Sequence, residues 1–171
     1  EDFHWIPGAR EAVAAFNRCF QWACGEFVAN LNDDCLVEGD ALAEGVRHLQ
    51  GNPSVGQVAF GFAMKSESVI EPWHTNRIYP DVSWSTLYVN FGITRRAAAL
   101  EVAEICGGFW NPAYRTYAGD CELSAWLHKL GWGVEALEHL HVVDVRNDDA
   151  LRAKNSSEAE REARRLYVRW P

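Results

Sequence analysis

The sequence lacks several features that would assign the protein to a common class. It has no run of 18 apolar residues, so we expect no membrane-spanning helix. It has no excess of basic residues: the formal net charge is -8, which argues against a general nucleic-acid binder. It also has no internal repeat and no Gly-x-Ser-x-Gly segment of the kind that carries a hydrolase nucleophile. A metal-dependent hydrolase therefore ranks behind the functions considered below.

The five cysteines show no paired C-x-x-C spacing and are odd in number. They are Cys19, Cys24, Cys35, Cys106 and Cys121. We interpret them as reduced thiols rather than a disulfide framework or a zinc site. With no recognisable signal peptide, we expect a cytoplasmic protein, with peripheral membrane association and a homo-oligomer left open.

The 171 residues fit a single domain, and 48% of them are apolar. Apolar spacing predicts helices over 9–24, 40–50, 95–106 and 121–130, and a charged helix over 156–168 within the C-terminal segment 146–171. Short apolar runs predict strands over 26–31, 55–62, 87–94 and 132–143. Loops are expected over 35–39, 64–86 and 109–119. This order predicts an α/β protein with a mixed, mostly parallel sheet flanked by helices.

An acidic turn follows the first predicted strand. The strand ends at Leu31, and Asn32-Asp33-Asp34 come directly after it. Ligands bind at the carboxyl ends of strands in open α/β sheets, and Mg²⁺ and Mn²⁺ take carboxylates together with substrate phosphates. We therefore interpret Asp34 as part of a site for a metal that holds a diphosphate. A solvated turn is the alternative, because Asn and Asp are common turn residues.

Asp120 and Glu122 lie at the start of the helix predicted after Gly119. A helix cap with a favourable dipole contact is the structural interpretation of Asp120. A general base in a cleft is the functional interpretation, and Gly119 would let a substrate approach the backbone closely.

His139, His141 and Asp144 lie near the end of the last predicted strand. Histidines two positions apart face the same side of a strand and can ligate a metal; a packed or surface pair is the structural alternative. Asp144 follows an apolar pair and can close a metal site begun by Asp34.

Two predicted loops are rich in aromatic residues. They contain Trp73, His74, Tyr79 and Trp84, and Phe109, Trp110, Tyr114 and Tyr117. Aromatic faces stack on sugars and bases, so a carbohydrate cleft is one interpretation, and packing within the loops is the other.

Taken together, the order of these segments resembles family 2 glycosyltransferases, including rhamnosyltransferases, from about residue 9 to residue 145. The first half carries Ala-Cys-Gly-Glu-Phe at 23–27, Leu-Asn-Asp-Asp-Cys at 31–35 and Asn-Pro-Ser-Val-Gly at 52–56. The second half carries Arg95-Arg96, Gly107-Gly108-Phe109 and Gly-Asp-Cys-Glu-Leu-Ser at 119–124.

The resemblance implies a GT-A-like fold, a nucleotide-diphosphate sugar donor, a saccharide or other hydroxyl acceptor, Mn²⁺ or Mg²⁺, and inversion at the anomeric carbon. It implies that Asp34 is a metal ligand and that Asp120 is the catalytic base. Asp144, which we also expect at the metal, stands where the family often has a metal-proximal His. Asn32 and Asp33 would contact the donor. The residues expected at the acceptor are Trp73, His74, Gly108, Phe109, Trp110 and Glu122. Further candidates are His139, His141, Arg95 and Arg96.

The sequence departs from the family pattern at several points. Asn32 replaces the first Asp of the Asp-x-Asp motif, Gly119 replaces the Glu before the base, and Trp126 replaces a common Arg. The family's first strands, which bind the nucleotide, would precede Glu1, so we expect an N-terminally truncated domain, a partner that supplies these strands, or a protein that no longer binds the donor well. A non-catalytic carbohydrate- or nucleotide-binding module with the same fold is the alternative function.

Overall fold

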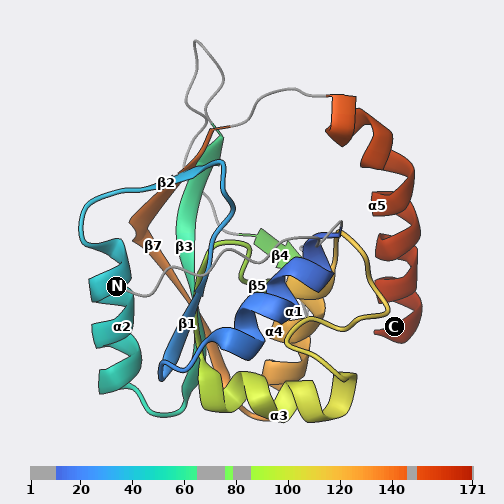
Figure 1. Ribbon diagram of the computed structural model, residues 1–171. Coiled ribbons are helices and arrows are strands. Elements are labelled where there is room, and N and C mark those ends of the chain that lie inside the picture. Colours follow the sequence, from blue (N-terminus) through green and yellow to red (C-terminus); the bar gives the residue numbers. More distant parts are fainter. Residues whose placement is uncertain (1–10, 65–75, 79–85, 146–149, 171) are drawn as a thin grey trace.

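The computed structural model describes residues 11–64, 76–78, 86–145 and 150–170, and these residues form five helices and seven strands (Figure 1). The helices are α1 (Ala12–Trp22), α2 (Ala41–Gly51), α3 (Arg96–Cys106), α4 (Gly119–Lys129) and α5 (Ala150–Arg169). The strands are β1 (Phe27–Asn30), β2 (Cys35–Val37), β3 (Val55–Met64), β4 (Asn76–Ile78), β5 (Thr86–Tyr88), β6 (Gly92–Arg95) and β7 (Gly133–Asp144). Every predicted helix is present, and the C-terminal one is longer than expected.

Five strands form one sheet in the order β1-β6-β3-β7-β2, and β4 pairs with β5 in a separate sheet. The expected α/β class and the mixed sheet are confirmed. The expectation of a mostly parallel sheet is wrong for the described residues, because β3 and β7 are parallel while the other three pairs of the large sheet are antiparallel. The physical reason is that β6 starts opposite Ala59 and runs back toward the beginning of β3.

The strand expected over 87–94 is two strands in two different sheets. Side chains bind the backbone at the first two residues between β5 and β6. The N–H of Val89 donates to Ser124 Oγ at 3.1 Å, and Asn30 Nδ2 donates to the carbonyl of Asn90 at 2.9 Å. These bonds hold a bend where the apolar pattern predicted a continuous strand.

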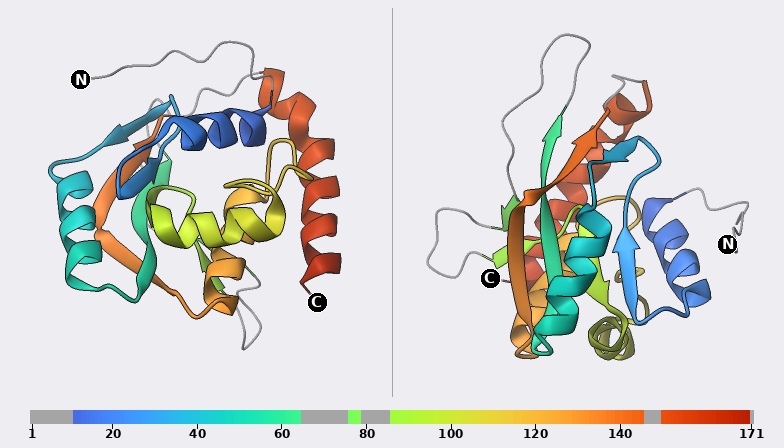
Figure 2. Two further views of the ribbon diagram at one scale, coloured as in Figure 1. Left: turned by 60° about the horizontal axis from the view of Figure 1, so that its bottom comes forward. Right: turned by 90° about the vertical axis from the view of Figure 1, so that its left-hand side faces the viewer.

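The large sheet has an apolar core on each face. Alternate residues of β3 point to opposite faces, so that Val58 and Phe60 belong to one core and Ala59 to the other. Helix α2 covers the first face, while α1, α3, α4 and α5 lie on the second (Figure 2). Since both faces are covered, the ends of the strands are left as the place for polar groups to gather.

A buried polar cluster ties α4 to the sheet. Gln57 of β3, Thr94 of β6 and Ser124 of α4 are fully buried. Ser124 Oγ donates to Gln57 Oε1 at 2.8 Å, and Gln57 Nε2 donates to Thr94 Oγ1 at 2.9 Å. A buried polar group that loses its partner costs about 1–3 kcal/mol, so the cluster favours one position of α4 along β3.

Strand β7 bulges where it passes Gly61. Phe60 pairs with Leu137, but Gly61 pairs with His141, so residues 138–140 are extra on the β7 side. A Cβ added to Gly61 would lie 2.5 Å from the carbonyl oxygen of Glu138. Glycine is therefore required where the bulge crosses β3.

We predict that Gly61→Ala lowers the free energy of unfolding by about 1–3 kcal/mol, because the backbone of β7 has to shift to admit the methyl group. Gly51→Ala is the matched control: it lies at the end of α2 with nothing within 4 Å of the added Cβ. Urea denaturation of both variants measures the difference. Equal stabilities would show that the bulge does not constrain Gly61.

Candidate active site

Strands β2 and β7 bring Asp34 next to Asp144 at one end of the sheet. Cys35 pairs with Asp144 across these strands, and the N–H of Val145 donates to the carbonyl oxygen of Asp34 at 2.8 Å. The expected loop over 35–39 is wrong at its start, because pairing with β7 makes its first residues a strand. Two residues predicted to hold a metal therefore lie on neighbouring segments of the chain.

The acidic residues at this end of the sheet differ in exposure. Asp144 is buried, Asp34 is half-buried, and Asp33 and Asn32 are exposed. Burial raises the pKa of the Cys35 thiol, and the negative charges of Asp34, Asp144 and Asp33 raise it further. The thiol thus lies in a negative environment, which a bound cation would offset.

Asp34 and Asp144 stay predicted ligands of a metal that would bind together with its substrate. In the described part of the chain, no group of three or more His, Cys, Asp or Glu side chains is placed to hold a metal ion. Mg²⁺ and Mn²⁺ nevertheless often take one or two carboxylates from a protein, since phosphates and water complete their coordination. Two carboxylates on neighbouring segments of the chain would fit that pattern better than a permanent structural metal site.

The histidines of β7 do not join Asp144. His141 and Asp144 are three positions apart in a regular part of the strand, so their side chains leave opposite faces of the sheet. His141 Nδ1 lies 3.6 Å from Glu38 Oε2, and His139 is exposed within the bulge at residues 138–140. The bulge also interrupts the alternation on which the predicted same-face pair depends.

Asp120 is half-buried in the first turn of α4. The helix begins at Gly119 after Ala118, so Asp120 is inside the helix, and the cap interpretation is wrong. Asp120 Oδ1 accepts a hydrogen bond from the N–H of Cys121 at 2.8 Å. Burial raises the pKa of the Asp120 carboxyl, and hydrogen bonds from Cys121 oppose part of the shift. A raised pKa makes the carboxylate a better proton acceptor.

Tyr88 and Cys121 are the neighbours of Asp120 that the sequence analysis missed. Burial raises the pKa of the Tyr88 hydroxyl, and the nearby Cys121 and Asp120 raise it further. Burial also raises the pKa of the Cys121 thiol well above its usual value, with Asp120 as the next cause. Both groups therefore stay protonated near the carboxylate. No sequence signal pointed to Tyr88, whose proximity depends on β5 packing against α4.

The start of α4 and the ends of β3 and β7 face the same way. Helix α4 leads through the short turn at 130–132 into β7, so the helix and the strand run in opposite directions (Figure 1). The N-terminal turn of α4, with Asp120, is therefore the end of this helix that is nearer to Asp34 and Asp144.

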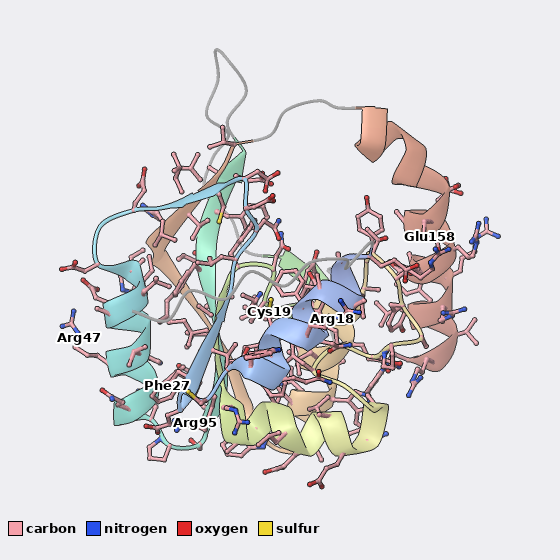
Figure 3. The ribbon with its side chains drawn as sticks, viewed as in Figure 1. Arg18, Cys19, Phe27, Arg47, Arg95 and Glu158 are labelled. Carbon is pink, nitrogen blue, oxygen red and sulfur yellow. The ribbon has the colours of Figure 1, made fainter. Side chains whose placement is uncertain are left out.

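Arg95 and Arg96 lie away from this end and bind backbone instead. Arg95 Nε donates to the carbonyl of Val55 at 3.1 Å, and its Nη2 donates to that of Leu49 at 2.6 Å. The guanidinium also lies 5.2 Å from the centre of the Phe27 ring (Figure 3). Arg96 Nε donates to the carbonyl of Ala23, the residue that follows α1, at 2.9 Å. Both arginines join helix ends to the sheet.

The segment Gly108-Phe109-Trp110 lies in the core rather than in an open cleft. Phe109 and Trp110 are buried. The Asn17 side chain accepts from the N–H of Trp110 and donates to its carbonyl, both at 2.8 Å. A Cβ on Gly108 would come within 2.9 Å of the Asn17 amide. The structure therefore supports the packing interpretation for these three residues.

Glu122 is likewise an internal residue, only 1% exposed. Its carboxylate accepts from Asn111 Nδ2 at 3.0 Å and pairs with Arg169 Nε of α5 at 2.7 Å. Trp126 Nε1 donates to the same carboxylate at 3.3 Å. This placement gives Glu122 a structural role between α4 and α5. Of the remaining acceptor candidates, Trp73 and His74 lie outside the described residues.

A comparison with protein families matches residues 6–111, more than half of the chain, to glycosyl transferase family 2. The chain belongs to this family. The mixed α/β fold agrees with the GT-A-like domain that the resemblance implied. A search of curated proteins found no matching relative.

The family 2 match covers only part of the candidate site. It includes the acidic turn at 32–34 and ends before Asp120, Glu122 and Asp144. The roles of the later residues therefore rest on their positions in the structure. In the described part of this family 2 chain, none of the helices combines the length and the apolar character needed to cross a bilayer.

We predict that Arg95→Lys lowers the free energy of unfolding by about 1–2 kcal/mol, because an ammonium cannot make the same set of bonds to backbone carbonyls. Binding of Mn²⁺ with UDP should stay unchanged. Arg47→Lys on α2 is the control, since its side chain is 67% exposed (Figure 3). If Arg95→Lys loses nucleotide binding but keeps its stability, Arg95 contributes to the binding site and the structural interpretation is wrong.

Proposed function

We propose that the chain is a metal-dependent glycosyltransferase domain that moves a sugar, with inversion, from a nucleotide-diphosphate sugar to an acceptor hydroxyl. Membership of family 2 supports the transferase class. The observation that carries the proposal further is the pairing of Cys35 with Asp144, which places Asp34 beside Asp144 at the strand ends.

Asp34 and Asp144 are the residues that would hold Mn²⁺ or Mg²⁺, with Asn32 and Asp33 exposed in the same turn to contact the donor. A divalent ion at this position neutralises negative charge on a leaving diphosphate. Without a cation, the carboxylates would repel the diphosphate, so donor binding should depend on the ion.

Asp120 is the proposed general base. Its carboxylate takes the proton of the acceptor hydroxyl as the oxygen forms a bond to the anomeric carbon and the carbon–oxygen bond to the diphosphate breaks. Attack from the face opposite the leaving group inverts the configuration. The partly buried carboxylate, with its raised pKa, suits proton acceptance better than a fully solvated one.

Gly119 is compatible with this role although the family pattern has Glu there. A Cβ at Gly119 would lie 2.9 Å from side-chain atoms of Trp110. The bulky Trp110 side chain therefore excludes a carboxylate at this position in this chain. Packing against Trp110 therefore explains why Gly119 replaces the family's Glu, and the proposed role of Asp120 does not depend on that Glu.

A non-catalytic binding module is the second candidate. The match to family 2 ends before Asp120, so family membership gives no support for a catalytic role of the acceptor half. Such a module would bind Mn²⁺ and a nucleoside diphosphate but would turn over none of a panel of UDP-, GDP- and dTDP-sugars.

For the donor side, we predict that Asp34→Asn weakens Mn²⁺ binding in the presence of UDP or GDP by about tenfold or more, because one of two carboxylate ligands is lost. Asp40→Asn is the matched control, since Asp40 is exposed and makes no capping hydrogen bond to α2. Isothermal titration calorimetry compares the two. Equal affinities in the wild type and both variants would remove Asp34 from the site.

For the base, we predict that Asp120→Asn lowers sugar transfer by about 10², because the amide cannot accept the proton. Mn²⁺–UDP affinity and the unfolding midpoint should stay close to those of the wild type. Release of nucleoside diphosphate from the donor that the wild type uses measures the rate. Full activity in Asp120→Asn would make another group the base.

A further inference from the structure

The C-terminal helix α5 carries a buried carboxylate that the proposed reaction does not use. Glu162 is 1% exposed. Its carboxylate accepts hydrogen bonds from the backbone N–H groups of three consecutive residues, Arg115, Thr116 and Tyr117, at 3.1 Å from Thr116 and 2.5 Å from Tyr117. Successive N–H groups that converge form an anion-binding concavity, so this loop conformation and the charge of Glu162 stabilise each other.

The same loop enters α4 through an uncommon backbone conformation. Ala118 follows Tyr117 directly and has a φ of 61°, in the left-handed region that is unfavourable for residues with a Cβ. Such a conformation persists where the surroundings hold it. The bonds from Glu162 end at Tyr117, so they hold the chain immediately before Ala118 and three residues before Asp120.

Other residues on the same face of α5 contact residues that precede and follow Asp120 in the sequence. Arg165 donates to the carbonyl of Ala113 before it, and Arg169 pairs with Glu122 after it. Leu166 is buried in the core between these polar contacts. Arg165, Leu166 and Arg169 follow Glu162 by three, four and seven residues, which places all four on one face of the helix.

We propose that α5 is a clamp that holds the Asp120 carboxylate in place, with Glu162 as its positioning residue. This rests on the proposed role of Asp120 as the base. Glu162 touches no reacting atom and acts through the backbone at 115–118. The clamp lies beyond residue 111, where the match to the family ends.

Cys121 provides a readout of the clamp that does not need activity. Its thiol is half-buried beside Asp120, and burial holds it protonated, so alkylation should be slow. Cys19 is exposed, so its alkylation rate shows whether the reagent is equally active in each sample. Cys35 lies on the distant β2 and reports general unfolding. Mass spectrometry after iodoacetamide treatment gives a rate for each cysteine.

The variant is Glu162→Gln, whose amide offers one acceptor oxygen where the carboxylate has two. The matched control is Glu160→Gln, an exposed position on the same helix. We expect Glu162→Gln to raise the alkylation rate at Cys121 about tenfold, with Cys35 and Cys19 unchanged. We also expect kcat to fall about tenfold with little change in the donor KM. Glu160→Gln should resemble the wild type.

An unchanged rate at Cys121, an equal rise at Cys35, or a rise at Cys121 with full kcat would each overturn the proposal. If Glu162→Gln does not fold, Arg165→Met removes the hydrogen bond to Ala113 and the cation–π contact with Tyr114, and should produce a smaller change in the same direction. Failure of the proposed function is a separate result: Asp120→Asn would then keep full activity, whatever the alkylation rates show.

Discussion

The parallel pairing of β3 with β7 is the constraint on which the rest of the structure depends. It sets Asp144 opposite Met64 at the end of both strands, and it leaves the far edge of β7 free to pair with β2. That second pairing turns the chain after Asp34 back along β7. The close passage at Gly61 shows how little freedom the pairing allows, since even a methyl group there meets backbone. The acidic end of the sheet is therefore a consequence of strand register.

Helix α4 is held at two places, and the position of the Asp120 side chain depends on both. On the sheet side, Ser124 is bonded to the buried Gln57, which fixes the helix one turn after Asp120. On the other side, Glu162 of α5 binds the loop before it. The proposed role of Asp120 as a base requires a fixed position and partial burial of its carboxylate. In this proposal Gln57, Ser124 and Glu162 supply both conditions without contacting the reacting atoms.

The sequence predicted the helices and the acidic turn because these depend on local patterns: apolar spacing for the helices, and an apolar run ending in carboxylates for Asp34. It could not predict β2, because residues 35–37 become a strand only through pairing with β7. The sequence also could not show whether Trp110 lies in the core or lines a cleft. The backbone of Trp110 is bound by the side chain of Asn17, which is 93 residues away. The sequence also contains no sign that α5 contacts the loop before α4. Glu162 binds backbone N–H groups there, and every residue type except proline provides such a group.

The central claim is that Asp34 and Asp144 together hold a divalent ion at the strand ends. The most direct test is a crystal of the chain grown with Mn²⁺ and UDP, with diffraction measured near the manganese absorption edge. The account predicts an anomalous peak within about 2.5 Å of oxygen atoms from both carboxylates. A peak bound to other side chains, or UDP bound with no peak at this end of the sheet, would contradict it.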